Sequence, residues 1–88
     1  MTTFAQAPDV GVIDDGVRVF AAALPDGPIV VLADIAAVVW RAAPGRDVHA
    51  LALQLIEDGI CTEETASADA GLFTHALIDV GLLREEED

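Results

Sequence analysis

The stretch PDGPIVVLADIAAVVW, residues 25–40, decides the fold of this chain. The turn sequence PDGP leads into a run of β-branched residues, Ile29–Leu32, which continues almost directly into the alanine-rich segment 34–43. β-Branched residues favour strands, and a strand that is apolar on both faces usually lies inside a sheet. A chain of 88 residues has few other strands with which to cover this one. The sequence therefore raises the question of what covers Ile29–Leu32.

Two more strands are predicted before this stretch. The run VGVI (10–13) ends in DDG, and the run VRVFAAAL (17–24) ends in PDG. Both triplets carry the residues that tight turns prefer, including a glycine that tolerates a positive φ angle. Together with residues 28–32, these runs predict a three-stranded antiparallel meander. Pro28 has no N–H group, which suits the start of a strand or the edge of a sheet.

Three helices are predicted after the strands. Residues 34–43 are apolar on nearly all sides, so we expect a buried helix with Asp34 near the free N–H groups of its first turn. The second helix is expected to begin with Asp47 as its N-cap and to end at Gly59. Its core stripe is Val48, Leu51, Ala52, Leu55 and Ile56. The third helix is expected to run from near Ser67 to Gly81. Its core stripe is Ala70, Phe73, Ala76, Leu77 and Val80.

Strands followed by helices predict an α+β fold, and the order is winged-helix-like, with an N-terminal three-stranded antiparallel sheet followed by three helices. The chain shows neither an internal repeat nor a linker, so residues 1–88 are expected to form a single domain. Residues 1–8 and 84–88 are expected to be flexible termini, because the acidic sequence REEED at 84–88 is typical of a solvated tail.

Acidic residues dominate the charge, with 16 Asp and Glu against four arginines, and the formal net charge is −12. A protein that binds nucleic acid neutralises phosphates with Lys and Arg, so this composition argues against nucleic-acid binding, and also against anionic membranes. The chain has no apolar run of the roughly 18 residues typical of a membrane span, and residues 1–10 do not resemble a secretion signal. Cys61 is the single cysteine and forms no internal disulfide. These features predict a cytoplasmic protein.

Candidates for chemistry are few. His49 and His75 are expected on different helices, and with Cys61 they show none of the close spacing of a zinc site. Glu63 and Glu64 follow Cys61 closely and would disfavour its thiolate. The chain has no lysine for a phosphate-binding loop. We therefore expect no catalytic residue, no metal and no cofactor, and so a protein that is not an enzyme.

Three clusters resemble the PqqD-like family, small peptide-binding domains also called RiPP recognition elements. LADIAAVVW (32–40) resembles the family's strand running into a helix, GRDV (45–48) its entry to the second helix, and ADAGLFTHALIDVGLL (68–83) its closing helix. The likeness spans nearly the whole chain, from Val10 to Leu83. Many members carry a capping Asn or Ser where this chain has Ala33, so Asp34 is expected to take over that role.

The resemblance implies a non-catalytic module that captures the leader segment of a ribosomally synthesised precursor peptide by β-strand addition. A partner enzyme, such as a radical SAM protein, a cyclase or a peptidase, would then modify the peptide. The leader would lie beside the third strand, in a groove walled by the third helix. The site residues expected on this basis are Ile29, Val30, Val31, Leu32, Ala33, Asp69, Leu72, Phe73, Ala76 and Asp79.

Strand addition also answers the opening question on physical grounds. An edge strand presents unpaired N–H and C=O groups to another strand, and alternate side chains then supply selectivity. By the strand period of two, Val30 and Leu32 share one face, while Ile29 and Val31 share the other. The bound peptide would then cover the strand Ile29–Leu32, which the chain itself does not cover.

Other interpretations stay open. The main alternative is a protein-interaction adaptor of winged-helix fold that grips an enzyme or regulator without delivering a peptide. The free strand edge could also pair two copies into a homodimer. An acyl carrier protein would need a modified serine in a DSL-type motif, whereas Ser67 is the only serine and lacks that motif. A DNA-reading winged helix would need basic residues on its recognition helix, and residues 67–80 contain neither Lys nor Arg.

Overall fold

The computed structural model describes residues 2–87 and has an α+β fold, in which strands come first and three helices follow. This confirms the predicted fold class. The elements are β1 (Thr2–Gln6), β2 (Val10–Asp14), β3 (Val19–Ala23), β4 (Val30–Leu32), α1 (Ile35–Ala42), α2 (Val48–Glu57), α3 (Ala66–Asp79) and β5 (Leu83–Glu87). The predicted meander corresponds to β2, β3 and β4, which form an antiparallel sheet in that order.

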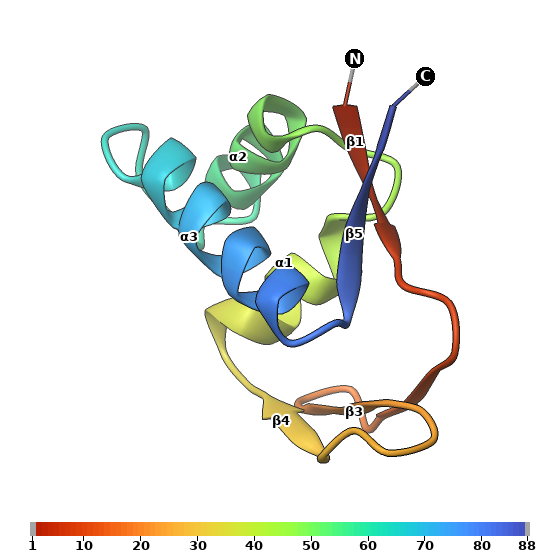
Figure 1. The fold of residues 1–88 in the computed structure, drawn as a ribbon. Helices are drawn as coiled ribbons and strands as arrows, with labels where there is room; N and C mark the ends of the chain where they lie inside the picture. The colour runs from red at the N-terminus through yellow and green to blue at the C-terminus, as the bar shows by residue number, and fades with distance from the viewer. Residues whose placement is uncertain (1, 88) are drawn as a thin grey trace.

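The two ends of the chain form a second sheet, which corrects the expectation of flexible termini at 1–8 and 84–88. Strand β1 pairs antiparallel with β5, from Thr2 opposite Glu87 to Gln6 opposite Leu83. The two strands lie side by side in Figure 1. Burial of Phe4 and Leu83 in the core explains why this ribbon stays on the domain. Positions 1 and 88 lie outside the described residues.

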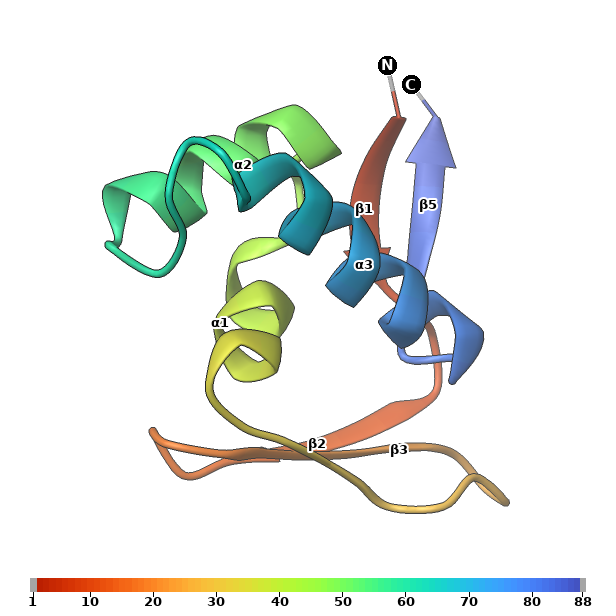
Figure 2. The same cartoon turned by 90° about the vertical axis from the view of Figure 1, so that its left-hand side faces the viewer.

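Figure 2 shows the domain as two layers, with α1, α2 and α3 all on one side of the β2–β3–β4 sheet. The sheet contributes Val19, Ala21 and Leu32 to the core between the layers. The helices contribute, among others, Val39, Trp40, Leu51, Leu55 and Leu77. Trp40 is buried, as expected of a packing anchor. The core is therefore built mainly from aliphatic side chains around one tryptophan.

Helix α2 follows its prediction closely. Asp47 is the N-cap, and its carboxylate accepts a 2.7 Å hydrogen bond from the N–H of Ala50. At the other end Gly59 has a φ angle of +73°, and the N–H of Ile60 bonds to the carbonyl of Leu55. This is a Schellman ending, in which a residue with positive φ lets the chain satisfy the last carbonyls of the helix. Leu51, Ala52 and Leu55 of the predicted stripe are buried and Ile56 is half-buried, whereas Val48 is exposed.

Helix α3 differs from its predicted core stripe. Ala70 and Leu77 are buried and Phe73 is half-buried, but Ala76 and Val80 are exposed. Thr74 is buried instead, because its hydroxyl donates a 2.7 Å hydrogen bond to the carbonyl of Ala70. The buried face of the helix is therefore rotated from the predicted one, and a polar residue that satisfies its own hydroxyl takes part in it.

The junction between β4 and α1 is the second correction. Asp34 stands at the N-cap of α1, but its side chain accepts no capping hydrogen bond. Its backbone has φ 53° and ψ −125°, a conformation that glycine adopts readily and other residues adopt under strain. Asp34 therefore turns the chain from strand to helix without capping the helix.

Candidate functional site

The backbone hydrogen bonds of the β2–β3 hairpin reveal which groups of β3 face which neighbour. In an antiparallel ladder, pairs that exchange hydrogen bonds alternate with pairs that do not. The N–H of Asp15 donates to the carbonyl of Arg18 at 3.1 Å, which marks a bonded pair at the end of the hairpin. Two positions along, Ile13 and Phe20 are therefore a bonded pair as well. The backbone groups of Phe20 thus point toward β2.

The same alternation fixes the free edge of β4. Because Phe20 bonds toward β2, its neighbours Val19 and Ala21 direct their backbone groups toward β4, where they stand opposite Leu32 and Val30. Val31 stands opposite Phe20 and directs its N–H and C=O away from β3. Within the described residues no strand pairs with this outer side of β4. Val31 therefore presents one backbone donor and one acceptor at an open edge.

The five strand positions expected in the site divide between two faces. Val30 is half-buried and Leu32 is buried, and both lie on the helix side of the sheet. Val31 and Ile29 are exposed, which agrees with the predicted alternation, although Ile29 lies one residue before β4 begins. Ala33 is exposed just beyond the strand. The free edge is thus short, since only three residues belong to β4.

The five helix positions expected in the site share one flank of α3. Asp69, Leu72, Phe73, Ala76 and Asp79 fall at i, i+3, i+4, i+7 and i+10 along the helix. Phe73 is half-buried against the core, while Leu72, Ala76 and Asp79 are exposed. Asp69 is half-buried and accepts a 3.4 Å hydrogen bond from the Sγ of Cys61. This flank combines an exposed leucine with a small alanine and two carboxylates.

Three hollows on the surface of residues 2–87 are further candidates for a binding site. One, of about 410 Å³, lies between β1, the start of α2 and the other flank of α3, and both histidines line it. The second, of about 300 Å³, lies between α1 and α2. The third, also about 410 Å³, lies on the β2–β3–β4 sheet and includes Ile29. None of these three hollows brings the strand positions and the helix positions of the expected site together.

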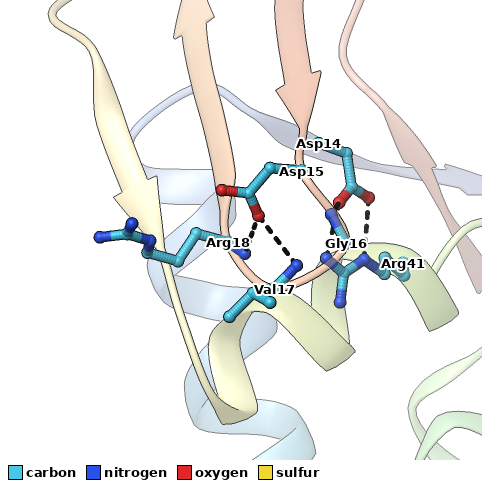
Figure 3. A network of polar contacts seen from close by, with 6 residues as sticks. All are labelled: Asp14, Asp15, Gly16, Val17, Arg18 and Arg41. Atoms are coloured by element: carbon cyan, nitrogen blue, oxygen red, sulfur yellow. Dashed lines mark hydrogen bonds and ion pairs between the residues drawn. The ribbon is translucent and has the colours of Figure 1, made fainter.

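The strongest electrostatic contacts of the domain surround the hairpin turn between β2 and β3 (Figure 3). Asp14 accepts two hydrogen bonds from the guanidinium of Arg41 on α1, at 2.7 and 2.8 Å, and a third from the N–H of Gly16. These bonds, led by the one from the Arg41 side chain, lower the pKa of Asp14 to about 2. The pair fastens one end of the sheet to the helix layer.

The carboxylate of Asp15 stabilises the hairpin turn by accepting hydrogen bonds from its backbone. Its Oδ1 accepts hydrogen bonds from the N–H groups of Arg18 at 2.6 Å and Val17 at 2.8 Å, and these bonds lower its pKa. Both aspartates thus act as turn residues, as their position in the DDG triplet predicted.

The remaining titratable candidates offer little to a reaction. Burial raises the pKa of the Cys61 thiol, and the nearby Asp69 carboxylate raises it further, so the thiolate is disfavoured. The neighbour responsible is Asp69 rather than the expected Glu63 or Glu64. Within residues 2–87, no three His, Cys, Asp or Glu side chains gather closely enough to hold a metal ion. In the same range, no helix has the length and apolar character needed to cross a bilayer.

Comparison of the chain with family models, with curated proteins and with solved structures finds no significant match.

One exposed surface was not predicted from the sequence. The outer face of the β2–β3–β4 sheet exposes Ile13 and Leu24 beside the half-buried Phe20. Its signal was present in the run VRVFAAAL, where both alternate sets of residues are apolar apart from Arg18. A period of two cannot tell which of two largely apolar sets faces the core, so the sequence does not predict which set forms the surface.

Proposed function

We propose that this chain is a non-catalytic module that captures the leader segment of a ribosomally synthesised precursor peptide by β-strand addition at β4. The module would present the peptide to a modifying enzyme, such as a radical SAM protein, a cyclase or a peptidase. The resemblance to the PqqD-like family suggests the kind of ligand, and the open edge of β4 supplies a place for it. In this proposal the module acts in the cytoplasm, where precursor and enzyme are made.

The observation that carries the proposal is the outward orientation of the Val31 backbone. Its N–H and C=O face away from β3, at the edge of the sheet order β2–β3–β4. An extended peptide could use this donor and acceptor and so continue the ladder. Because β4 is three residues long, the added strand would itself be short. Much of the selectivity would then come from side-chain contacts.

The flank of α3 that carries Leu72 and Ala76 supplies those contacts in the proposal. Ala76 is small and exposed, which leaves room for a bulky apolar side chain of the peptide beside it. The net charge of −12 favours a leader that is cationic or that depends on apolar anchors. If apolar anchors dominate, affinity falls only modestly as salt is raised, whereas a steep fall would indicate ionic anchors.

The test is a binding titration with a fluorescein-labelled synthetic peptide that carries the leader sequence of a candidate precursor. Val31→Pro removes the outward N–H while leaving the hydrogen bonds of Val30 and Leu32 to β3 in place, so we expect leader binding to be lost. Val31→Ala keeps the N–H and should retain most of the affinity.

A matched control lies at the opposite edge of the same sheet. Val12 on β2 also directs its backbone outward, because its neighbours Gly11 and Ile13 form the bonded pairs with β3. Val12→Pro should therefore leave leader binding unchanged. Unchanged affinity in a folded Val31→Pro variant, or loss of binding in Val12→Pro alone, would refute the proposal.

A second candidate is favoured by the apolar outer face of the sheet. It is the adaptor that grips an enzyme or regulator without delivering a peptide. Nuclear magnetic resonance with ¹⁵N-labelled protein separates the two functions, because leader binding at β4 must shift the Val31 amide signal most strongly. A protein partner that leaves this signal unchanged while perturbing β2 and β3 would favour the adaptor.

A further inference from the structure

The face of the β2–β3–β4 sheet that points away from the helices is apolar at every strand position directed outward. These positions are Gly11, Ile13, Phe20, Ala22 and Val31. An antiparallel sheet with one face in water normally alternates apolar residues inside with polar residues outside. This sheet is apolar on both faces, although helices cover only one of them (Figure 2).

The outer face is also well exposed. Ile13 keeps 70% of its surface accessible, Ile29 keeps 74% and Val31 keeps 52%. A hollow of about 410 Å³ runs over this face between Ile13, Phe20, Leu24 and Ile29. Single exposed apolar residues are ordinary, but a contiguous apolar face on a small domain marks an interaction surface.

The dimensions of the face fit one α-helix. Neighbouring strands lie about 4.8 Å apart, so the outer two of three strands are about 10 Å apart, which matches the diameter of a helix with its side chains. The five residues of β2 or β3 span about 17 Å, which equals about 11 helical residues, or three turns. A helix laid on this face would complete a three-layer arrangement of helix, sheet and helix.

The charges around the face determine which helix would fit. Asp9 lies at one end of the β2–β3 hairpin and Asp15 at the other, while Asp26 lies in the turn before β4. The one cation among them is Arg18, whose guanidinium lies 5.8 Å from the centre of the Phe20 ring, so three carboxylates surround the face against one guanidinium. Two copies of this chain placed face to face would each bring a net charge of −12, which repels. A helix with basic flanks would instead meet a surface of net opposite charge.

We propose that this outer face binds an amphipathic α-helix of a partner protein, about three turns long, with an aliphatic stripe flanked by Lys and Arg. The aliphatic stripe would pack on Ile13, Phe20 and Ile29. Leader addition uses the backbone edge of β4, whereas helix binding uses side chains of the outer face. The two activities are therefore separable, and helix binding does not depend on the proposed peptide capture.

The probe is a synthetic amphipathic peptide of about 12 residues with a Leu stripe and Lys on both flanks. One comparison peptide has Glu in place of every Lys, and another has the same composition in scrambled order. Binding to full-length ¹⁵N-labelled protein is followed by amide shifts. We expect the Lys-flanked peptide to bind with its largest shifts at Ile13, Phe20 and Ala22, and the other two to bind at least about tenfold more weakly, a difference of about 1.4 kcal/mol.

Ile13→Gln combined with Ile29→Gln removes two highly exposed side chains of the face without changing the charge, so the fold should survive. This variant should bind the Lys-flanked peptide at least about tenfold more weakly. The matched control, Val48→Gln with Leu53→Gln, removes exposed apolar side chains from α2 and should bind like the original chain.

Several outcomes would overturn the proposal. Equal binding of the scrambled peptide would show that charge alone, and not the aliphatic stripe, determines binding. Equal binding of the Glu-flanked peptide would show that the ligand does not need basic flanks. Shifts confined to the helices would place the peptide elsewhere. Sedimentation velocity of the chain alone should show a monomer. A dimer abolished by Ile13→Gln with Ile29→Gln would assign the face to a second copy instead.

Discussion

Strands β1 and β4 are both strands of a small sheet, yet their backbones are used very differently. One side of β1 pairs with β5, and on its other side the N–H of Phe4 donates to the carbonyl of Arg46 while the carbonyl of Phe4 accepts from Gly45, both at 2.8 Å. In β4 only the side toward β3 is paired. The loop residues Gly45 and Arg46 thus pair with the outer edge of β1, whereas the outer edge of β4 at Val31 is open.

The comparison shows that a domain of this size can pair both sides of a strand, as it does for β1. Proteins usually protect edges, and a short strand is one way to do so. β4 has only three residues, with Pro28 before it and the strained Asp34 after it. These features limit the length of any strand that can be added, which favours a short guest segment over open-ended aggregation.

The largest expected effect tests whether β1 belongs to the core. Phe4→Ala should lower the free energy of unfolding by about 4 kcal/mol, because it leaves a cavity where a buried ring packed. Thr3→Ala, its neighbour on the same strand, should cost less than about 1 kcal/mol. Denaturant titration measures both. Equal, small losses would restore the interpretation of residues 1–8 as a flexible terminus.

The next effect distinguishes the two sides of β4 by stability alone. Val30→Pro removes an N–H that bonds to β3 and disturbs a half-buried side chain, so it should cost about 3 kcal/mol. Val31→Pro removes an N–H that points outward and should cost less than about 1 kcal/mol. Thermal and denaturant unfolding give the two values. A larger loss for Val31→Pro would mean that the hydrogen-bond alternation derived for β4 is wrong.

A smaller effect, of opposite sign, is expected where β4 leads into α1. Asp34→Gly should raise the free energy of unfolding by about 1 kcal/mol, because glycine adopts a φ angle of 53° without strain and no capping bond is lost. Asp34→Asn keeps the Cβ and removes the charge, so it should not stabilise the chain. If both variants were equally stabilising, relief of charge repulsion rather than backbone strain would be responsible.

The smallest effect concerns the ion pair that fastens the β4-containing sheet to α1. Because the pKa of Asp14 is lowered from 3.8 to about 2, its contribution to stability is complete above pH 3.8 and is lost as the pH falls toward 2. Asp14→Asn should therefore give a shallower fall of melting temperature between pH 4 and 2. Arg41→Gln removes the same pair and should reproduce this change. If the melting temperature of both variants fell between pH 4 and 2 as steeply as that of the original chain, the ion pair would contribute no measurable stability.

Local patterns in the sequence were sufficient for the meander and for α2. Turn triplets delimited the strands, and Asp47 and Gly59 delimited the helix, because each of these signals acts within a few residues of its own position. The β1–β5 ribbon was not predicted, because it joins residues 77 to 85 positions apart and depends on Phe4 and Leu83 meeting in the core. A run of glutamates gives no local sign of such a partner.

The candidate site was predictable to a similar degree. The alternation of Val30 and Val31 between two faces followed from the strand period, and the open edge of β4 followed from the number of strands. The exposure of Ala76 and the burial of Thr74 did not, since the rotation of α3 is set by packing and by a hydroxyl that bonds within its own helix. Hydrophobicity alone places an alanine inside and a threonine outside.

Pairing of Thr2 with Glu87 places the first and last residues that the structure describes beside each other. Because its two terminal strands pair, the domain could be inserted into a surface loop of an enzyme while the residues that flank the insertion stay close together. The same proximity would let a short linker join the ends while new ends are opened elsewhere, giving a circular permutant with its strand edge intact.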